Sequence, residues 1–153
     1  MTKSIVGIAG LQDLVGEHLG YSDWVQITQE QVDLFAEATG DHQWIHVDPE
    51  RAKKESPFGG PIAHGYLTLS MGPTLFPQIA TISGIAMALN YGAGKVRFPS
   101  PVPVGANLRL GATLDSVEEA GGGGVQVVMT FTFEVEGAAK PSCVAEIIFR
   151  YYA

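Results

Sequence analysis

Asp41 and His46 stand five residues apart in this chain and could act together on one water molecule. A carboxylate and an imidazole that reach the same water can orient it and take its proton. Histidine suits this task because its ordinary pKa, about 6.5, is close to physiological pH. Farther along, His64 and Gly65 stand where a helix is expected to begin. An N–H in a first helical turn has no acceptor within the helix, so the Gly65 amide could bind a carbonyl oxygen and stabilise an enolate. These residue types predict acid–base chemistry beside a carbonyl group.

The same side chains permit other interpretations. His42 and His46 have the i, i+4 spacing of a zinc pair, but such pairs lie on a helix, and a new helix is expected to begin only at Asp48-Pro49. We therefore expect no metal. Asp41 by itself could be a polar turn residue. His64 suits a structural role, bonding a helix end or a partner subunit, better than that of a direct acid.

Two helices are expected to hold residues 41–47 between them. Thr28 and Gln31 have the spacing of a capping box, and Gly40 suits the residue that follows a helix end. Asp48-Pro49 supplies the N-cap and the first-turn proline of the next helix. The segment 41–47 is thus predicted to be a connector that is rigid enough to position side chains.

A buried helix and a sheet are expected to form the rest of the protein. Residues 56–94 contain no Asp, Glu, Lys or Arg, and a helix from about Ile62 to Met71 without a charged face must be surrounded by protein. Gly72-Pro73 should kink or split it. A short helical turn is expected at residues 8–14, and a hairpin turn at 121–124. Strand candidates lie at residues 24–27, 85–91, 95–98, 107–114, 126–135 and 143–151. An α+β fold follows, with an antiparallel sheet of about five strands wrapped around the helix.

Composition limits the kinds of partner. The 153 residues suit one domain, 1–153, and a charged fraction of 16% beside 46% hydrophobic residues predicts a folded globule. Nine basic against sixteen acidic residues leave a net charge of −7, with no basic run suited to nucleic acid. Prolines and glycines interrupt residues 56–94, so no membrane span is expected. The single cysteine, Cys143, fits a reducing compartment, and we expect a cytoplasmic protein. The large uncharged region predicts a homodimer, because one short sheet could not cover it.

Several runs together resemble a known family. The segments Gly40-Asp41, Ile45-His46, 60–65 (G-P-I-A-H-G), 91–92 (Y-G) and 95–102 (K-V-R-F-P-S-P-V) resemble the MaoC-like dehydratases, or (R)-specific enoyl-CoA hydratases. The resemblance covers most of the chain and implies a single hotdog fold, a homodimer and reversible addition of water to a trans-2-enoyl thioester. It assigns Asp41 and His46 as the catalytic pair and the Gly65 amide as the contact to the thioester oxygen. No cofactor is implied, because the acyl-CoA or acyl carrier protein thioester is itself the substrate.

The implied substrate adds four candidate binding residues. Lys95 and Arg97 could lie near the phosphates of the ligand, although most such residues are simply solvated charges. His64 could contact the substrate, and Tyr66 is expected to pack in the core first and to line an acyl pocket second.

The chain departs from the family pattern at two places. Gln43-Trp44 stands where the motif has Asn-Pro, and a serine that assists in some members falls at Pro73. Three alternatives stay open beside the hydratase: a (3R)-hydroxyacyl dehydratase acting on acyl carrier protein, a non-catalytic acyl-binding hotdog subunit, and a hotdog thioesterase.

Overall fold

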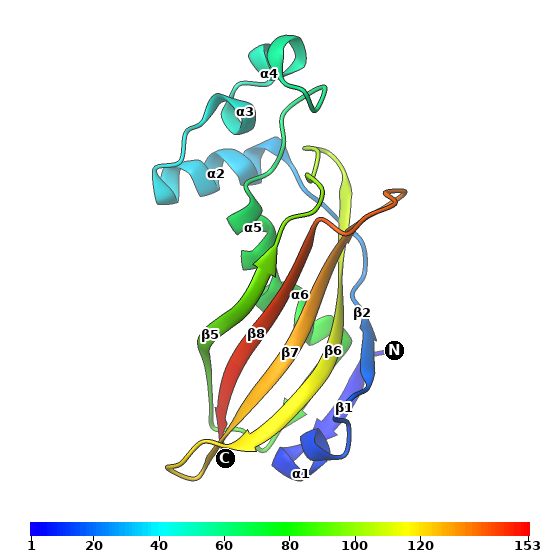
Figure 1. Ribbon diagram of the computed structural model, residues 1–153, viewed down its shortest axis with the longest axis vertical. Helices are drawn as coiled ribbons and strands as arrows, with labels where there is room; N and C mark the ends of the chain where they lie inside the picture. The colour runs from blue at the N-terminus through cyan, green and yellow to red at the C-terminus, as the bar shows by residue number, and fades with distance from the viewer.

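One curved antiparallel sheet dominates the computed structural model, which describes residues 1–153 (Figure 1). Its strands lie in the order β2-β6-β7-β8-β5, and β3 pairs with β6 beside β2. The bounds are β2 His18–Tyr21, β3 Val25–Gln26, β5 Met87–Arg97, β6 Asn107–Glu119, β7 Gly124–Val135 and β8 Cys143–Tyr152. The predicted hairpin at 121–124 joins β6 to β7, and the two candidates at 85–91 and 95–98 form the single strand β5. This arrangement confirms the α+β prediction.

Alternation along β6, β7 and β8 gives the sheet one apolar face. Leu110, Phe131, Phe133 and Ala145 point to that face and are almost completely buried. The same alternation buries Leu108, Ala112, Met129 and Cys143. Successive side chains of a strand point to opposite faces, so the intervening polar residues lie on the outer surface. The main hydrophobic core therefore lies between this face and the helices that cover it.

Two consecutive helices, α5 (Gly65–Ser70) and α6 (Gly72–Ile79), cover the apolar face (Figure 1). Pro73 stands in the first turn of α6, so the predicted split at Gly72-Pro73 is confirmed. A Cβ on Gly72 would lie 3.0 Å from the ring of Phe131, and glycine here allows α6 to approach the sheet closely. The helix start expected at His64-Gly65 is confirmed, and the earlier start near Ile62 is wrong. Ile62 instead forms a β-bridge with Pro103, and the helix begins at Gly65.

The helices α2 (Gln29–Thr39) and α4 (Pro49–Glu55) lie at one end of the sheet, as Figure 1 shows. Thr28 and Gln31 form the predicted capping box, and Gly40 takes the left-handed conformation at φ 82°. The segment between the two helices is not entirely a loop, because Trp44–Val47 forms one helical turn, α3. That turn fixes the direction in which His46 points.

Short elements lie at the other end of the sheet, and among them only the helical turn, α1 (Gly7–Gln12), was predicted, at residues 8–14. β1 (Lys3–Val6) pairs in parallel with β4 (Ala80–Ser83), and α1 follows β1. β2, which begins at His18, was also not predicted. Four-residue strands carry too few alternating positions to stand out from their glycine-rich surroundings. No helix is both long and apolar enough to cross a membrane.

Candidate active site

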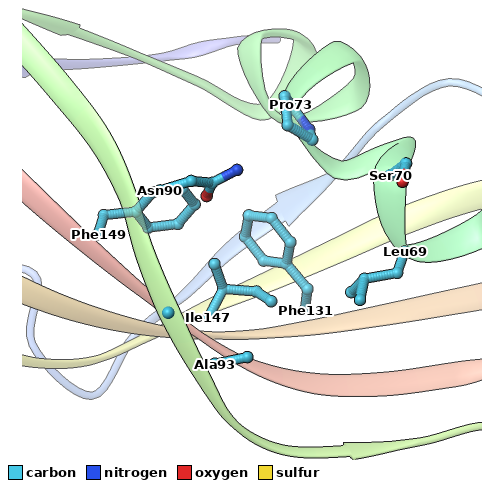
Figure 2. A pocket seen from close by; sticks show the side chains of 9 residues that line it. Leu69, Ser70, Pro73, Asn90, Ala93, Phe131, Ile147 and Phe149 are labelled. Atoms are coloured by element: carbon cyan, nitrogen blue, oxygen red, sulfur yellow. The ribbon is translucent and has the colours of Figure 1, made fainter. Parts of the chain in front are cut away.

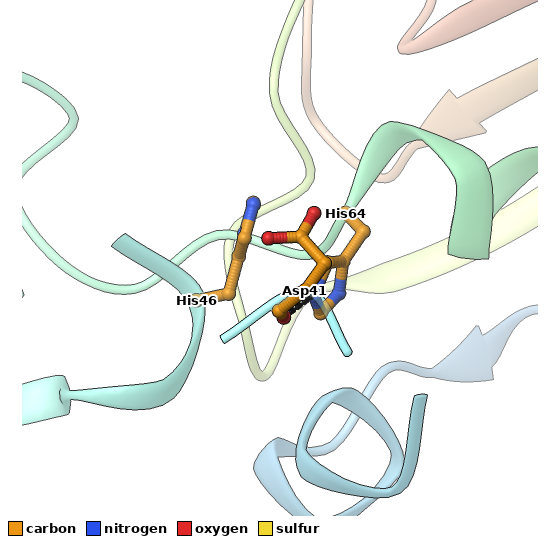
Figure 3. A group of neighbouring side chains, drawn as sticks. All are labelled: Asp41, His46 and His64. Carbon is orange, nitrogen blue, oxygen red and sulfur yellow. Dashed lines mark hydrogen bonds between the residues drawn. The ribbon is translucent and has the colours of Figure 1, made fainter. Parts of the chain in front are cut away.

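Asp41, His46 and His64 come together although they belong to different parts of the chain (Figure 3). Asp41 follows α2, His46 lies on α3, and His64 is the N-cap residue of α5. A carboxylate oxygen of Asp41 and one ring nitrogen from each histidine lie within 4.8 Å of one another. The two imidazoles are stacked, with centroids 4.0 Å apart and planes 26° apart. His46 and His64 are buried, whereas Asp41 is exposed.

The hydrogen bonds of His46 define its tautomer. Its Nδ1 lies 2.6 Å from the carbonyl oxygen of Ile62. A carbonyl only accepts, so Nδ1 carries the hydrogen and the Nε2 lone pair of the neutral ring stays free. The backbone carbonyl of His46 accepts a second bond, 2.7 Å long, from Nε2 of Gln29 on α2. Backbone and ring are thus both held in place, and the free Nε2 is available as a base.

Burial lowers the pKa of His46 below its ordinary value of 6.5. Burial is the largest influence on this pKa. The hydrogen bond to the Ile62 carbonyl, which raises the pKa, comes next, followed by His64, which lowers it, and the Asp41 carboxylate, which raises it. Since the lowering prevails, the ring is neutral at pH 7, which is the form that can accept a proton.

The Asp41 carboxylate is turned toward the His46 ring across a small cavity (Figure 3). One of its oxygens accepts a 3.3 Å bond from the Gln43 backbone N–H, which restricts its rotation. The cavity has a volume of about 240 Å³, ample for a water molecule beside a ligand group. Its lining consists of Asp41, His46, His64, Gly65, Tyr66 and Phe98.

The replacement of Asn-Pro by Gln43-Trp44 leaves this geometry possible. Gln43 is the N-cap residue of α3, and its side chain makes no capping bond. The guanidinium of Arg51 on α4 lies 4.3 Å from the centre of the Trp44 ring. That cation–π contact joins α3 to α4, so Trp44 helps to hold the turn that carries His46.

Gly65, the first residue of α5, lies at the wall of the same cavity. A Cβ at this position would lie 3.0–3.2 Å from three ring carbons of Phe98, so only glycine fits without displacing that ring. Sequence reasoning did not single out Phe98. The available signal was its place in the run 95–102, which was used only as part of the family motif.

Two further cavities adjoin α5. One, of about 280 Å³, reaches from His46 and Gly65 to the loop 98–102 and Ser142. The other, of about 370 Å³, lies along α5 between the helices and the sheet (Figure 2). In this second cavity Phe131, Ile147 and Phe149 of the sheet face Leu69 and Pro73 of the helices. Pro73 supplies no hydroxyl there, and the Ser70 hydroxyl donates to the Tyr66 carbonyl at 2.6 Å.

Of the remaining predicted binding residues, Tyr66 lies at the site, whereas Lys95 and Arg97 do not line it. Tyr66 lines the cavity at Asp41, but its side chain is 70% exposed and does not pack in the core as expected. Its ring lies at 77° to the Phe98 ring, with centroids 6.2 Å apart. Lys95 and Arg97 lie near the end of β5, are exposed, form no ion pair and line none of the three cavities just described. Arg97 directly precedes Phe98, which lines the cavity at Asp41.

The cluster is poorly arranged for a metal ion. Nδ1 of His46 and Nε2 of His64 already donate to backbone carbonyls, those of Ile62 and Asp41. The rings are stacked with their planes 26° apart, and only Nε2 of His46 and the buried Nδ1 of His64 are left without a backbone partner. His42, which has the i, i+4 spacing to His46, lies 3.4 Å from Glu37 on the surface.

Sequence comparison agrees with this architecture. A family model described as "MaoC like domain" matches residues 11–135, and the chain belongs to the MaoC-like dehydratase family. The family predicted from the motifs is thus confirmed. The protein called 3-hydroxyacyl-thioester dehydratase Z of Mycobacterium tuberculosis (strain ATCC 25618 / H37Rv) is 56% identical over 151 residues, which cover 99% of each chain.

Solved structures show the same hotdog fold. The R-hydratase PhaJ1 of Pseudomonas aeruginosa matches with a TM-score of 0.69 and 22% identity, over 90% of this chain and 81% of that one. The HadBC (3R-hydroxyacyl-ACP dehydratase) complex of M. tuberculosis matches with a TM-score of 0.69 and 17% identity, over 90% of this chain and 97% of that one. At these identities the likeness concerns the fold alone.

Proposed function

We propose that the protein is an (R)-specific enoyl-CoA hydratase, a hydro-lyase that reversibly adds water to a trans-2-enoyl thioester and gives the (R)-3-hydroxyacyl thioester. One observation carries the proposal: the free Nε2 of His46, the Asp41 carboxylate and Gly65 border the same small cavity. The name of the relative at 56% identity supports the reaction class. The (R) stereochemistry rests on the resemblance to the family.

In the hydration direction, a water molecule lies between Asp41 and His46. Nε2 of His46 takes a proton from this water as its oxygen attacks C3 of the enoyl group, and Asp41 orients the water and stabilises the imidazolium. Electrons of the double bond move toward the thioester oxygen, where the Gly65 N–H binds the developing enolate. A proton returned to C2 completes the addition, so water is consumed and no redox partner is needed.

The acyl chain would follow α5 away from this point. The cavity of about 370 Å³ begins one helical turn beyond Gly65 and is lined mainly by apolar side chains (Figure 2). Its polar lining residues are Ser70 and Asn90. An apolar tail placed there would be removed from water, which favours binding by about 0.8 kcal/mol for each buried CH₂ group.

We also propose that a second copy of the chain covers β5. This strand is an edge of the sheet, and ten of its eleven residues are exposed, including Met87, Leu89 and Tyr91. A long edge strand with apolar side chains offers unpaired backbone groups to another strand, and monomeric proteins generally protect such edges. Pairing of β5 with its counterpart would bury these side chains and would also enclose the cavity beside Asn90.

His46→Ala tests the proposed function. The rate of crotonyl-CoA hydration, measured as the loss of enoyl absorbance, should fall by a factor of about 10²–10⁴ because the base is missing. The variant also leaves the Ile62 carbonyl without its donor, so folding is verified by circular dichroism below the melting temperature. His42→Ala is the matched control, because His42 is exposed and lies against Glu37. Turnover by His46→Ala at close to the wild-type rate, or release of free thiol in place of hydration by the wild type, would sink the assignment.

The carrier of the thioester is a separate question. The same site could serve a (3R)-hydroxyacyl dehydratase that acts on acyl carrier protein, and the exposed cations Lys95 and Arg97 suit the phosphate of either carrier. Comparing kcat/KM for one acyl chain on CoA and on carrier protein separates the two substrates. A purified homomer that is inactive on both would instead indicate a non-catalytic acyl-binding subunit.

A further inference from the structure

His64 lies at the centre of the site, yet the proposed steps assign it no task. Its side chain is 2% exposed. The ring is enclosed by two others: His46 at a centroid distance of 4.0 Å and Phe35 of α2 at 4.8 Å. It therefore joins α2, α3 and the start of α5 at the point where the three elements meet.

The two ring nitrogens of His64 have different surroundings. Nε2 lies 3.0 Å from the backbone carbonyl oxygen of Asp41 (the dashed line in Figure 3). Since that oxygen only accepts, Nε2 carries the hydrogen. Nδ1 is buried and has no hydrogen-bond partner. A proton there would leave a buried donor unsatisfied beside His46, so the neutral Nε2–H tautomer is the one that fits.

The hydrogen bond from His64 is the shortest one made by the Asp41 backbone. The Asp41 N–H lies 3.5 Å from the Thr39 hydroxyl, at the limit of a hydrogen bond. The preceding residue, Gly40, has a left-handed conformation and ends α2, so the helix does not hold Asp41 directly. Without the His64 donor, the main chain at Asp41 would be free to shift, and the direction of its carboxylate would shift with it.

We propose that His64 is a positioning residue: its Nε2–H holds the Asp41 main chain so that the carboxylate faces the free nitrogen of His46. His64 itself does not touch the reacting atoms in this scheme, and the bond rather than the bulk of the ring is the essential feature. The inference rests on the proposed hydration at Asp41 and His46.

Three substitutions separate the bond from the bulk. His64→Gln places an amide N–H near the former Nε2, and His64→Asn places it near the former Nδ1, where nothing accepts it. His64→Phe keeps a stacked ring but has no donor. We expect kcat to fall about tenfold in the Phe and Asn variants, as for a lost hydrogen bond of ordinary strength, with KM within about twofold of wild type. His64→Gln should retain most of kcat.

A purely structural role predicts the opposite order. If filling space and stacking were what mattered, His64→Phe would keep more activity than His64→Gln. A kcat for the Phe variant equal to or above that of the Gln variant, at equal folded fraction by circular dichroism, overturns the inference. His42→Gln, which removes an exposed histidine from the same segment, is the control and should leave kcat unchanged.

Imidazole ¹⁵N chemical shifts of the unmodified protein provide a test that does not depend on folding of the variants. The expected result is the Nε2–H tautomer for His64 and the Nδ1–H tautomer for His46. An Nδ1–H tautomer at His64 overturns the inference. Failure of the proposed function is distinguishable, because the wild type would then hydrate no enoyl thioester at all. Failure of this inference alone leaves wild-type hydration intact.

Discussion

Gly65→Ala is expected to damage catalysis far more than stability. The added methyl group would lie 3.0 Å from Cε1, 3.1 Å from Cδ1 and 3.2 Å from Cγ of Phe98. These separations are shorter than ordinary carbon–carbon contacts, so the Phe98 ring must move by a few tenths of an ångström or more. The ring is 42% exposed and can turn toward solvent, and alanine in a helix is favoured over glycine by up to about 1 kcal/mol. The free energy of unfolding should therefore change by less than about 1 kcal/mol.

The catalytic loss follows from the position of the same methyl group. It would stand beside the Gly65 N–H, on the wall of the cavity that also holds Asp41 and His46. A thioester carbonyl kept away from that N–H loses a hydrogen bond that strengthens in the transition state. Loss of one such donor costs about 10²–10³ in kcat, and the lower figure corresponds to about 2.7 kcal/mol. We expect kcat/KM for crotonyl-CoA hydration to fall about a hundredfold.

Two matched variants sharpen this experiment. Gly60→Ala adds a methyl group in the same region with no atom within 4 Å, and it should keep full activity. The double variant Gly65→Ala/Phe98→Ala removes the steric contact but keeps the methyl group beside the amide. If displacement of Phe98 caused the loss, the double variant would recover activity. Activity of Gly65→Ala within about threefold of wild type would refute a role for the Gly65 amide, since that corresponds to less than 1 kcal/mol.

Three further predictions concern the catalytic pair and assembly. Asp41→Asn and His46→Gln should each lower kcat by on the order of a hundredfold or more, with little change in KM. The double variant should have a kcat little below that of either single variant. If the two losses in kcat multiply instead, the two residues do not act on one water. Because neutral His46 is the base and burial lowers its pKa below 6.5, kcat/KM for hydration should fall with decreasing pH along a limb centred below 6.5; a midpoint above 6.5 in the pH–rate profile would show that Asp41 outweighs burial. Light scattering at micromolar concentration should show a dimer for the wild type and dissociation for Leu89→Lys on the edge strand; a monomeric wild type would contradict the proposed pairing.

Local patterns predicted much of the scaffold. The capping box at Thr28, the left-handed Gly40 and the helix start at Asp48-Pro49 depend on a few neighbouring residues, so they could be recognised without tertiary information. Alternation along β6 to β8 revealed the buried face of the sheet for the same reason. The helical turn α3 and the strands β1 and β4 were missed because each has only four residues.

The candidate site was predictable in its residue types but not in its contacts. Asp41, His46 and Gly65 were recognised because their order and spacing match a family motif and their side chains suit the chemistry. Which nitrogen of His46 is free depends on the Ile62 carbonyl, 16 residues away in sequence and brought close only by folding.

Long-range packing also determined which residues surround Asp41 and His46. Phe98 reaches Gly65 because the end of β5 lies beside the start of α5, and His64 reaches the Asp41 carbonyl across 23 residues of chain. The sequence by itself determined which groups can exchange protons and where helices begin and end, because those properties are local. The tertiary structure decided tautomer, burial and therefore the direction of the His46 pKa shift, because these depend on neighbours that no spacing along the chain specifies.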